Sequence, residues 1–332
     1  MKKDEKRYSM KAFVIYQAGG PDRLKLEERP IPEWKEGWVL IKVKAFGLNR
    51  SEYFTRIGES PTVKFPRVLG IECTGEVVES GGIFVKGQKV MAIMGGMGRQ
   101  FDGSYAEYTL VPKDNVFPFE SKLPWETLGA LPEMLQTTNG SLFQGLEIDR
   151  AKNILIRGGT SSIGLCALAI AKNYGLEVIS TSRSESKVKF LKDFGSDFVV
   201  IDDGMLETKV KEIYPEGCDR ALELIGTTVL KDTLKCLRRG GIACMTGILG
   251  GEWEFNSFQP MGDIPTAVKL TSYSGEAADI TAEEMQKYIS LVEQKKLKVS
   301  IGKVFPFEEL VDAHRLMDAN KANGKIVIKL SE

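Results

Sequence analysis

The residues best suited to chemistry form a stretch of small side chains, GGTSSIG, at residues 158–164. An apolar segment precedes it at residues 153–157, and an apolar segment with a helical pattern follows it at residues 165–175. A strand, a tight turn and a helix start, in this order, form the phosphate-binding end of a dinucleotide fold. Small residues let the backbone approach a pyrophosphate, and the free N–H groups at the helix start attract its negative charge. The residues that we interpret as phosphate-binding are Gly158, Thr160, Ser161, Ser162, Ile163 and Gly164.

The spacing of this motif is GxxSxxG, at Gly158, Ser161 and Gly164, rather than the usual GxGxxG. Taken alone, the motif therefore leaves a Gly-rich turn of some other α/β protein as an alternative.

Short strand-like segments alternate with helical segments of about ten residues after this turn, which favours the dinucleotide interpretation. The candidate strands are residues 177–182, 198–201, 220–225, 242–246 and 269–274, and the candidate helices between them are residues 185–194, 206–214 and 228–237. Parallel strands need a crossover connection, usually a helix, so the alternation predicts a parallel sheet. Together with the strand before Gly158, the segments predict a six-stranded, doubly wound Rossmann domain.

The parts of the chain on either side of this region have a different sequence pattern. Residues 10–130 contain short β-like segments separated by Gly and Pro, and GKIVIKL at residues 324–330 is one further strand that we expect to return to them. Clustered short strands without long helices predict an irregular, mainly antiparallel β domain. We therefore expect an α/β protein in which a Rossmann domain (131–271) is inserted into a β-rich domain (10–130 and 272–332), after a disordered lead (1–9). Such an insertion leaves an interdomain cleft, which is a usual place for a ligand.

Composition indicates a soluble cytoplasmic enzyme. Lys plus Arg and Asp plus Glu both number 45, so no net charge draws the chain to nucleic acid or to an anionic membrane. The segment MKKDEKRYS lacks the apolar region of a signal peptide, and no apolar segment approaches the ~20 residues that span a bilayer. The cysteines contain no CxxC pair and predict buried, reduced thiols in a reducing compartment. They are Cys73, Cys166, Cys218, Cys236 and Cys244.

Several ordered blocks of the sequence resemble one known family. They are AFGLNRSEYFTRIG (45–58), PRVLGIECTGEVVESG (66–81), FDGSYAEYTLVP (101–112) and the turn at 158–164. In these blocks, and along nearly its whole length, the chain resembles the zinc-free, quinone oxidoreductase-like branch of the medium-chain dehydrogenase/reductase superfamily. The resemblance implies a GroES-like fold for the β-rich domain, and a homodimer whose Rossmann sheets pair through the last strand, 269–274.

The absence of metal ligands selects the zinc-free branch. Where zinc-dependent relatives carry Gly-His-Glu, this chain has Gly70-Ile71-Glu72, and Asn49 stands where they place a cysteine. Isoleucine cannot ligate a metal, and an amide is a poor partner for zinc. The four-cysteine lobe of the structural zinc has no counterpart, and the single histidine, His314, is expected at the surface of a helical segment. We therefore expect no metal.

The loss of the metal favours one class of substrate. Hydride transfer to a simple aldehyde builds alkoxide charge that a Lewis acid normally stabilises, whereas a quinone or enone spreads this charge over its conjugated system. The predicted function is NADPH-dependent reduction of a quinone or α,β-unsaturated carbonyl. The alternatives are a zinc-free enoyl-thioester reductase and a non-catalytic NADPH-binding protein.

Asn49 is the first candidate catalytic residue, because the resemblance implies that it faces the nicotinamide end of the cleft. The pattern Asn49-x-x-Glu52 also predicts a helix N-cap with its reciprocal glutamate, and the two roles can coexist. Arg56 and Glu72 match family positions as well, but an ion pair or another structural contact explains them equally.

Tyr53 is the second candidate catalytic residue. A phenol with a pKa near ~10 stays protonated at neutral pH and can donate a hydrogen bond or a proton. Many quinone reductases place their tyrosine one position later, where this chain has Phe54. A packed aromatic side chain is therefore the alternative for Tyr53.

The end of the second Rossmann strand predicts the choice of cofactor. NAD-selective folds bind the ribose 2′-OH there with Asp or Glu, whereas this chain has Ser182 and Arg183, with Lys187 close behind. Small hydroxyls and an arginine suit the 2′-phosphate of NADPH, and the resemblance implies that Lys187 corresponds to a phosphate-binding lysine. Ordinary solvated charges are the alternative for Arg183 and Lys187. The resemblance adds four cofactor-binding residues, Thr137, Thr246, Gly247 and Ile248.

Overall fold

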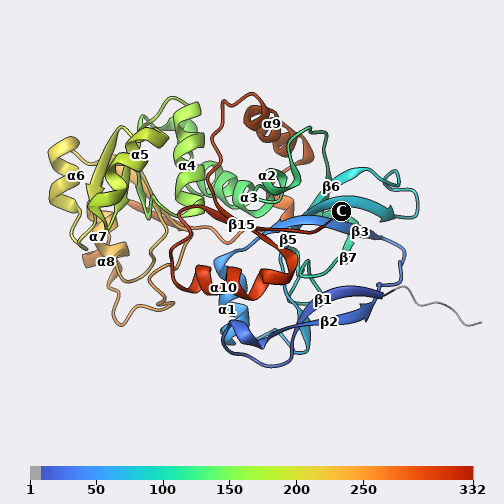
Figure 1. The fold of residues 1–332 in the computed structure, drawn as a ribbon. Coiled ribbons are helices and arrows are strands. Elements are labelled where there is room, and N and C mark those ends of the chain that lie inside the picture. Colours follow the sequence, from blue (N-terminus) through green and yellow to red (C-terminus); the bar gives the residue numbers. More distant parts are fainter. Residues whose placement is uncertain (1–8, 332) are drawn as a thin grey trace, which may run out of the picture. The chain divides into compact units, whose positions relative to one another are not determined.

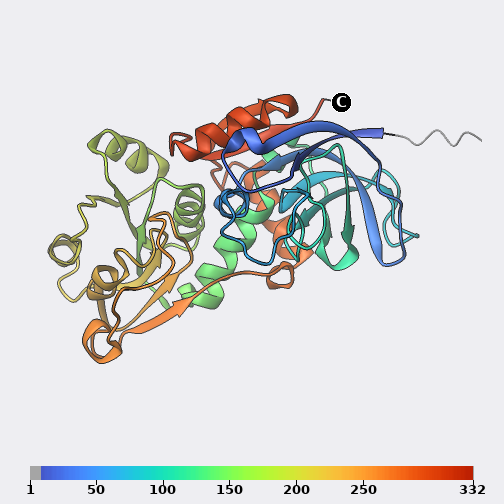
Figure 2. The same cartoon turned by 90° about the horizontal axis from the view of Figure 1, so that it is seen from below.

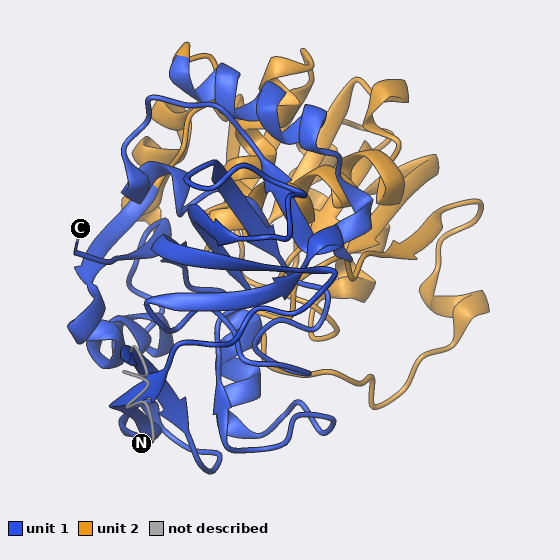
Figure 3. Cartoon of the chain, turned by 90° about the vertical axis from the view of Figure 1, so that its right-hand side faces the viewer, with its two compact units in different colours: residues 1–133, 276–293, 301–332 blue, residues 134–275, 294–300 orange. Residues whose placement is uncertain are grey.

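The computed structural model describes residues 9–331, and the chain divides into two compact units (Figures 1 and 3). Unit 1 contains the chain up to Glu133, Glu276–Glu293 and the chain from Ile301; unit 2 contains Met134–Gly275 and Gln294–Ser300. The boundaries expected at 130/131 and 271/272 lie within four residues of these, while residues 294–300 group with unit 2. Most of the expected disordered lead, residues 1–8, lies outside the described residues, and Ser9 begins the first strand.

Unit 2 contains the predicted six-stranded parallel sheet, with the order β11-β10-β9-β12-β13-β14. Its strands are β9 (Asn153–Arg157), β10 (Glu177–Ser182), β11 (Phe198–Ile201), β12 (Cys218–Glu223), β13 (Leu237–Met245) and β14 (Lys269–Ser272). The order reverses between β9 and β12, which is the topological switch point of a doubly wound fold. β14, orange in Figure 2, forms one outer edge of the sheet.

Helices cover both faces of this sheet. They are α4 (Ser162–Asn173), α5 (Val188–Phe194), α6 (Glu207–Ile213) and α7 (Leu230–Lys235). Right-handed crossovers place α4 and α5 on one face, and the reversal of strand order places α6 and α7 on the other. Because both faces are covered, the middle of the central strand β9 is continuously apolar: Ile154–Ile156 is fully buried. Unit 2 also holds most of α3 (Pro132–Gly140), the helical turn Ser141–Gly145 and the short α8 (Pro260–Asp263).

Unit 1 is the predicted mainly antiparallel β domain. A three-stranded sheet has the order β2-β1-β4, and a seven-stranded sheet has the order β15-β16-β3-β5-β6-β8, with β7 also paired to β3. The bounds are β1 (Ser9–Ile15), β2 (Leu24–Pro30), β3 (Trp38–Gly47), β4 (Arg67–Val68), β5 (Glu72–Glu79), β6 (Lys89–Ile93), β7 (Tyr108–Pro112), β8 (Val116–Pro118), β15 (Ile301–Pro306) and β16 (Lys325–Lys329). β16 pairs with β3, so the last strand returns to the first domain, as predicted.

The helices of unit 1 are α1 (Arg50–Ile57), α2 (Trp125–Leu128), α9 (Ala282–Glu293) and α10 (Leu310–Asp318). α1 contacts α10, next to which it lies in Figure 1, and a buried arginine joins the two helices. The guanidinium of Arg56 donates to both carboxylate oxygens of Asp318 at 2.7 Å and to the Gly19 carbonyl at 2.7 Å. This pair confirms the ion-pair interpretation of Arg56.

His314 is not at the surface, and our expectation for it was wrong. It lies on the buried face of α10 with Leu310, Ala313 and Met317, at the spacing of an amphipathic helix. Its Nε2 lies 3.0 Å from the Tyr105 hydroxyl, and both side chains are fully buried. Burial, and then the charge of Arg56, lower the pKa of His314 to about 3.

The five cysteines are buried free thiols, as expected. Burial raises the pKa of the Cys218 thiol to about 12, so it carries no charge at neutral pH. Among residues 9–331, no helix is both long enough and apolar enough to cross a bilayer.

We expect the imidazole of His314 to remain neutral in the folded protein across the range in which an ordinary histidine titrates. The unfolded chain protonates this ring below about pH 6.5 and the folded chain does not, so stability falls by up to about 1.4 kcal/mol per pH unit below 6.5. Because the chain has one histidine, a single set of imidazole NMR signals reports the titration directly. His314→Gln should lack this contribution to acid destabilisation. A folded-state titration near 6.5 would contradict the assignment.

Candidate functional site: a dinucleotide turn in unit 2 and a buried polar cluster in unit 1

The turn between β9 and α4 has the geometry that its sequence predicted. Gly158 has a φ of +91°, a left-handed conformation that favours glycine, and its N–H donates to Thr181 Oγ1 at 3.1 Å. Ser161 is the N-cap of α4: its Oγ accepts from the Gly164 N–H at 3.0 Å and donates to the Gly158 carbonyl at 2.8 Å. The serine of the GxxSxxG motif therefore holds the turn and caps the helix.

Gly164 allows close packing between the helix and the turn. A Cβ atom on Gly164 would lie 2.5 Å from the Gly158 carbonyl oxygen, which is closer than real Cβ atoms approach. The N–H groups of Ser162 and Ile163, in the first turn of α4, have no intrahelical acceptor. Thr160, Ser161, Ser162 and Ile163 are all half-buried, so this helix start can receive a pyrophosphate.

Two cations follow β10: Arg183 comes directly after the strand, and Lys187 ends the helical turn Glu185–Lys187. Ser182 is buried, and its Oγ accepts from the Ser184 N–H at 3.1 Å, which shapes the turn after the strand. Arg183 is exposed and Lys187 is half-buried, and neither forms an ion pair within residues 9–331. Cations that no internal carboxylate neutralises are suited to a phosphate.

Thr137 and Thr246 are joined by a residue that sequence reasoning missed. Ser141 Oγ donates to the Thr137 carbonyl at 2.6 Å and lies 2.8 Å from Thr246 Oγ1. Ser141 follows Thr137 by four residues in the same helical segment, so the i, i+4 spacing was the available signal. Gly247 passes close to the residue that follows β12, because a Cβ there would lie 2.4 Å from the Leu224 carbonyl oxygen. Ile248 after it is half-buried.

These groups lie at or after the carboxyl ends of parallel strands. The turn at Gly158 follows β9, Ser182 ends β10, and Thr246 follows β13. Carboxyl ends of parallel strands meet at one edge of a sheet, and a dinucleotide binds across that edge at the switch point. The structure therefore brings the expected cofactor-binding residues to one side of unit 2.

In unit 1, Asn49 is the N-cap of α1. Its backbone N–H donates to Glu52 Oε2 at 2.6 Å in a reciprocal capping box, which confirms the structural interpretation of Asn49. The Asn49 amide also has polar partners: Nδ2 donates to Glu72 Oε1 at 2.9 Å, and Oδ1 accepts from the Lys325 ammonium.

The partners of Asn49 form a buried charge cluster. The Lys325 ammonium lies 2.8 Å from Glu72 Oε1 and 3.3 Å from Glu133 Oε2, and the Glu133 N–H donates to Glu72 Oε2 at 2.7 Å. Although burial opposes it, the carboxylates of Glu72 and Glu133 raise the pKa of Lys325, so the lysine stays charged. Lys325 and Glu133 were missed by sequence reasoning; a lysine within the apolar strand KIVIK was the only signal.

Glu52 is a buried acid whose surroundings raise its pKa. Its side chain is buried and accepts from the Ile71 N–H at 3.1 Å as well as from Asn49. Burial, and then the charge of Glu72, raise the pKa of Glu52 to about 8. The start of α1 therefore presents an amide and a carboxyl that holds its proton more tightly than an ordinary glutamate.

Tyr53 packs its ring and leaves its hydroxyl available. The half-buried ring packs against the core of unit 1, in an edge-to-face contact with Phe54 at 5.3 Å between ring centroids. The guanidinium groups of Arg50 and Arg56 lie 5.0 and 5.4 Å from its ring centroid. This confirms that Tyr53 has a packing role, and within residues 9–331 its hydroxyl forms no hydrogen bond.

Known proteins resemble both parts of the chain. The family model of the alcohol dehydrogenase GroES-like domain matches residues 35–121, and that of the zinc-binding dehydrogenase matches residues 194–328. Human quinone oxidoreductase is 28% identical over 336 residues, which span 97% of this chain and 98% of the relative.

Solved structures share the fold. The quinone oxidoreductase from Coxiella burnetii is 27% identical with a TM-score of 0.82, covering 98% of this chain and 100% of that one. Escherichia coli quinone oxidoreductase complexed with NADPH has a TM-score of 0.86 at 20% identity, covering 96% and 99% of the two chains. The chain belongs to the medium-chain dehydrogenase/reductase superfamily and is quinone oxidoreductase-like, so it is an oxidoreductase.

The residues at the metal position of zinc-dependent relatives do not fit zinc. Asn49 offers an amide engaged at both ends, Ile71 offers no donor atom, and Glu72 is paired with Lys325. Within residues 9–331, no three side chains of His, Cys, Asp or Glu are grouped so that they could hold a metal ion.

Proposed function

We propose that this chain transfers a hydride from NADPH to a quinone or an α,β-unsaturated carbonyl without a metal. The observation that carries the proposal is the donor set at Asn49, Ile71 and Glu72, which does not fit zinc in a chain that otherwise has a dehydrogenase fold. A conjugated substrate spreads the charge that a zinc ion would otherwise stabilise. Relatives named quinone oxidoreductase support this substrate class.

The proposed cofactor is NADPH. Arg183 and Lys187 support it, because two cations at the end of β10 suit a 2′-phosphate and no carboxylate occupies position 182. The fold-level relative from Escherichia coli was solved with NADPH. Unit 2 would hold the pyrophosphate at the start of α4, and Thr137, Thr246, Gly247 and Ile248 would contact the nicotinamide half.

The bound cofactor supplies the hydride, and unit 1 supplies hydrogen bonds to the substrate oxygen. Tyr53 is the stronger candidate, because its hydroxyl has no acceptor among the described residues. Asn49 is the second candidate, although Nδ2 already donates to Glu72. The cluster of Glu72, Lys325 and Glu133 holds the amide of Asn49 in one orientation.

We also propose a cytoplasmic homodimer. The buried free thiols are consistent with a reducing compartment. β14 is an edge strand of the six-stranded sheet, and an exposed sheet edge is a template for pairing with a second copy.

The function is tested by following NADPH absorbance with 9,10-phenanthrenequinone, with an enone and with an enoyl thioester. We expect turnover with the quinone and the enone, undiminished by a metal chelator, because the proposed chemistry needs no Lewis acid. Binding of NADPH without any turnover would instead indicate a non-catalytic protein. Turnover with the thioester alone would favour an enoyl-thioester reductase.

The double variant Arg183→Ala/Lys187→Ala should lose most of the preference for NADPH over NADH. A charge-assisted contact to phosphate contributes about 1.5–3 kcal/mol, so NADPH affinity should fall roughly 10- to 100-fold while NADH affinity is nearly unchanged. Lys189→Ala/Lys192→Ala removes the same charge from neighbouring positions on α5 and serves as the matched control. If the ratio of NADPH affinity to NADH affinity is unchanged in Arg183→Ala/Lys187→Ala, other residues bind the 2′-phosphate.

Tyr53→Phe removes only the hydroxyl and keeps the packed ring. If Tyr53 donates to the substrate oxygen in the transition state, kcat should fall about 10²- to 10³-fold with little change in melting temperature. Tyr16→Phe, at an exposed tyrosine of unit 1 that donates to Glu27, is the control and should leave kcat unchanged. Near-normal kcat in Tyr53→Phe would make the tyrosine structural and solvent the proton source.

A further inference from the structure

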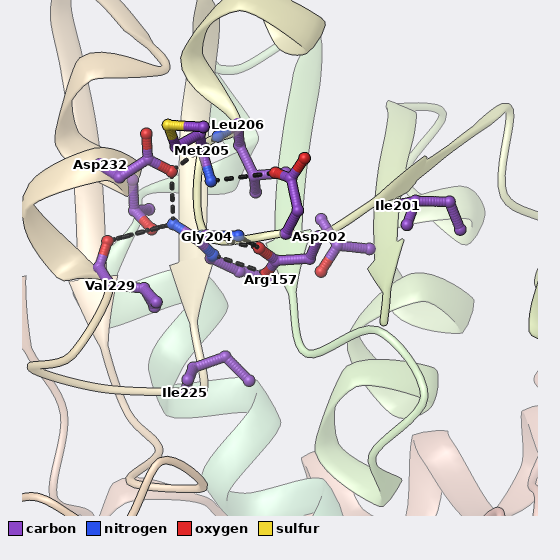
Figure 4. A network of polar contacts seen from close by, with 12 residues as sticks. Arg157, Ile201, Asp202, Gly204, Met205, Leu206, Ile225, Val229 and Asp232 are labelled. Atoms are coloured by element: carbon purple, nitrogen blue, oxygen red, sulfur yellow. Dashed lines mark hydrogen bonds and ion pairs between the residues drawn. The ribbon is translucent and has the colours of Figure 1, made fainter. Parts of the chain in front are cut away.

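Arg157 is a buried arginine at the last position of β9, directly before the phosphate-binding turn. Its side chain is fully buried, and it makes two parallel hydrogen bonds of 2.8 Å to Asp202, from Nε and from Nη2 (Figure 4). Nη1 donates to Asp232 Oδ2 at 2.8 Å and to Thr233 Oγ1 at 2.9 Å. The guanidinium therefore binds two carboxylates that are 30 positions apart in the chain, and only an arginine has the fork that matches both.

The two carboxylates hold the two ends of one turn. Asp202 follows β11 and accepts from the Gly204 N–H at 3.0 Å, and Asp232 on α7 accepts from the Leu206 N–H at 2.8 Å. Gly204 has a φ of +94°, and Leu206 is fully buried, whereas Met205 between them is 73% exposed. Arg157 thus fixes the start of the turn 202–206 through Asp202 and its end through Asp232, as Figure 4 shows.

The turn 202–206 follows the carboxyl end of β11, and the dinucleotide fold leads us to expect the adenosine half of the cofactor near it. The pyrophosphate binds at the turn after β9, and the adenosine ribose is recognised at the end of β10, so the adenosine half extends toward β11. Ile201 at the end of β11 is half-buried, and it offers apolar carbon on the same side of the sheet as the turn.

We propose that Arg157 is a positioning residue for the adenosine half of the cofactor, acting through the turn 202–206. The inference rests on the proposed function, because it requires that unit 2 binds NADPH. Arg157 does not touch the ligand: its guanidinium is buried and donates to Asp202, Asp232, Thr233 and the Val229 carbonyl. A turn held in its binding shape before the ligand arrives saves the entropy of ordering it on binding.

Arg157→Lys is the suitable variant. Replacement by an apolar residue would leave Asp202 and Asp232 without their cation, and an uncompensated buried charge destabilises the fold. Lysine keeps the charge but presents a single ammonium that cannot reproduce the fork to both carboxylates.

The test compares fragments of the cofactor, namely 2′,5′-ADP for the adenosine half and reduced nicotinamide mononucleotide for the other half. In Arg157→Lys we expect 2′,5′-ADP and NADPH to bind about tenfold more weakly. This factor corresponds to the free energy that one hydrogen bond typically contributes. Binding of the mononucleotide should be unchanged. The KM for NADPH should rise by the same factor, with kcat at saturating NADPH nearly unchanged.

Asp232→Ala provides a second variant, because it frees the Leu206 N–H and leaves Arg157 paired with Asp202. It should show the same selective loss of 2′,5′-ADP affinity. If Arg157→Lys does not fold, Asp232→Ala alone tests the inference. Arg220→Lys is the matched control: Arg220 is a buried arginine of β12 that donates to the carbonyls of Leu146, Glu147 and Asp219, away from the turn. It should bind 2′,5′-ADP as the wild type does.

Wild-type affinity for 2′,5′-ADP in a folded Arg157→Lys or Asp232→Ala variant would overturn the inference. An equal loss for all three ligands would overturn it too, because it would indicate general damage to unit 2. If the wild type binds neither NADPH nor 2′,5′-ADP, the proposed function itself fails. That result differs from the one in which the wild type binds both ligands and the variants keep wild-type affinity, because the latter overturns only the inference about Arg157.

Discussion

The parallel arrangement of the strands is the constraint on which the proposed cofactor site of unit 2 depends. Each strand needs a crossover helix to return to the same edge, so the carboxyl ends of all six strands lie together and every connection after a strand begins there. The turn at Gly158, the cations after Ser182, the turn 202–206 and Thr246 are distant in sequence, but each follows one of these ends. Sheet topology, rather than any single motif, brings them to one edge.

Paired buried charges fix the positions of the neighbouring polar groups in both units. Arg157 binds Asp202 and Asp232 in unit 2, and Lys325 binds Glu72 and Glu133 in unit 1. Burying a charge is tolerated only where partners and further hydrogen bonds compensate for lost hydration, so each pair fixes the groups around it. In unit 1, the Lys325 cluster holds the amide at the position where zinc-dependent relatives have a ligand. In unit 2, the Arg157 network holds the turn after β11.

Local sequence patterns predicted the helices and strands, but they could not predict the polar contacts between residues far apart in the chain. The boundaries of β9, β11 and α4 follow from apolar runs and from the cap at Ser161, which involve residues within one or two turns. The spacing of Asn49 and Glu52 predicted a capping box for the same reason. By contrast, Lys325 lies 276 residues from Asn49, and no periodicity relates the two positions. His314 was misjudged because its polarity outweighed its place on the apolar stripe of α10.

The sequence by itself determined the fold class of this protein, a Rossmann sheet inserted in a β-rich domain, and it predicted the turn at Gly158. The positions where a metal-dependent relative has His and Cys came from the resemblance to the family. The sheet and the turn follow from residue type and short spacing, because side-chain period and capping are local properties. Only the tertiary structure decided which buried charges pair, that Ser141 joins Thr137 to Thr246, and that one guanidinium holds both ends of the turn 202–206. Such pairings depend on packing, which brings together side chains that the chain itself keeps far apart.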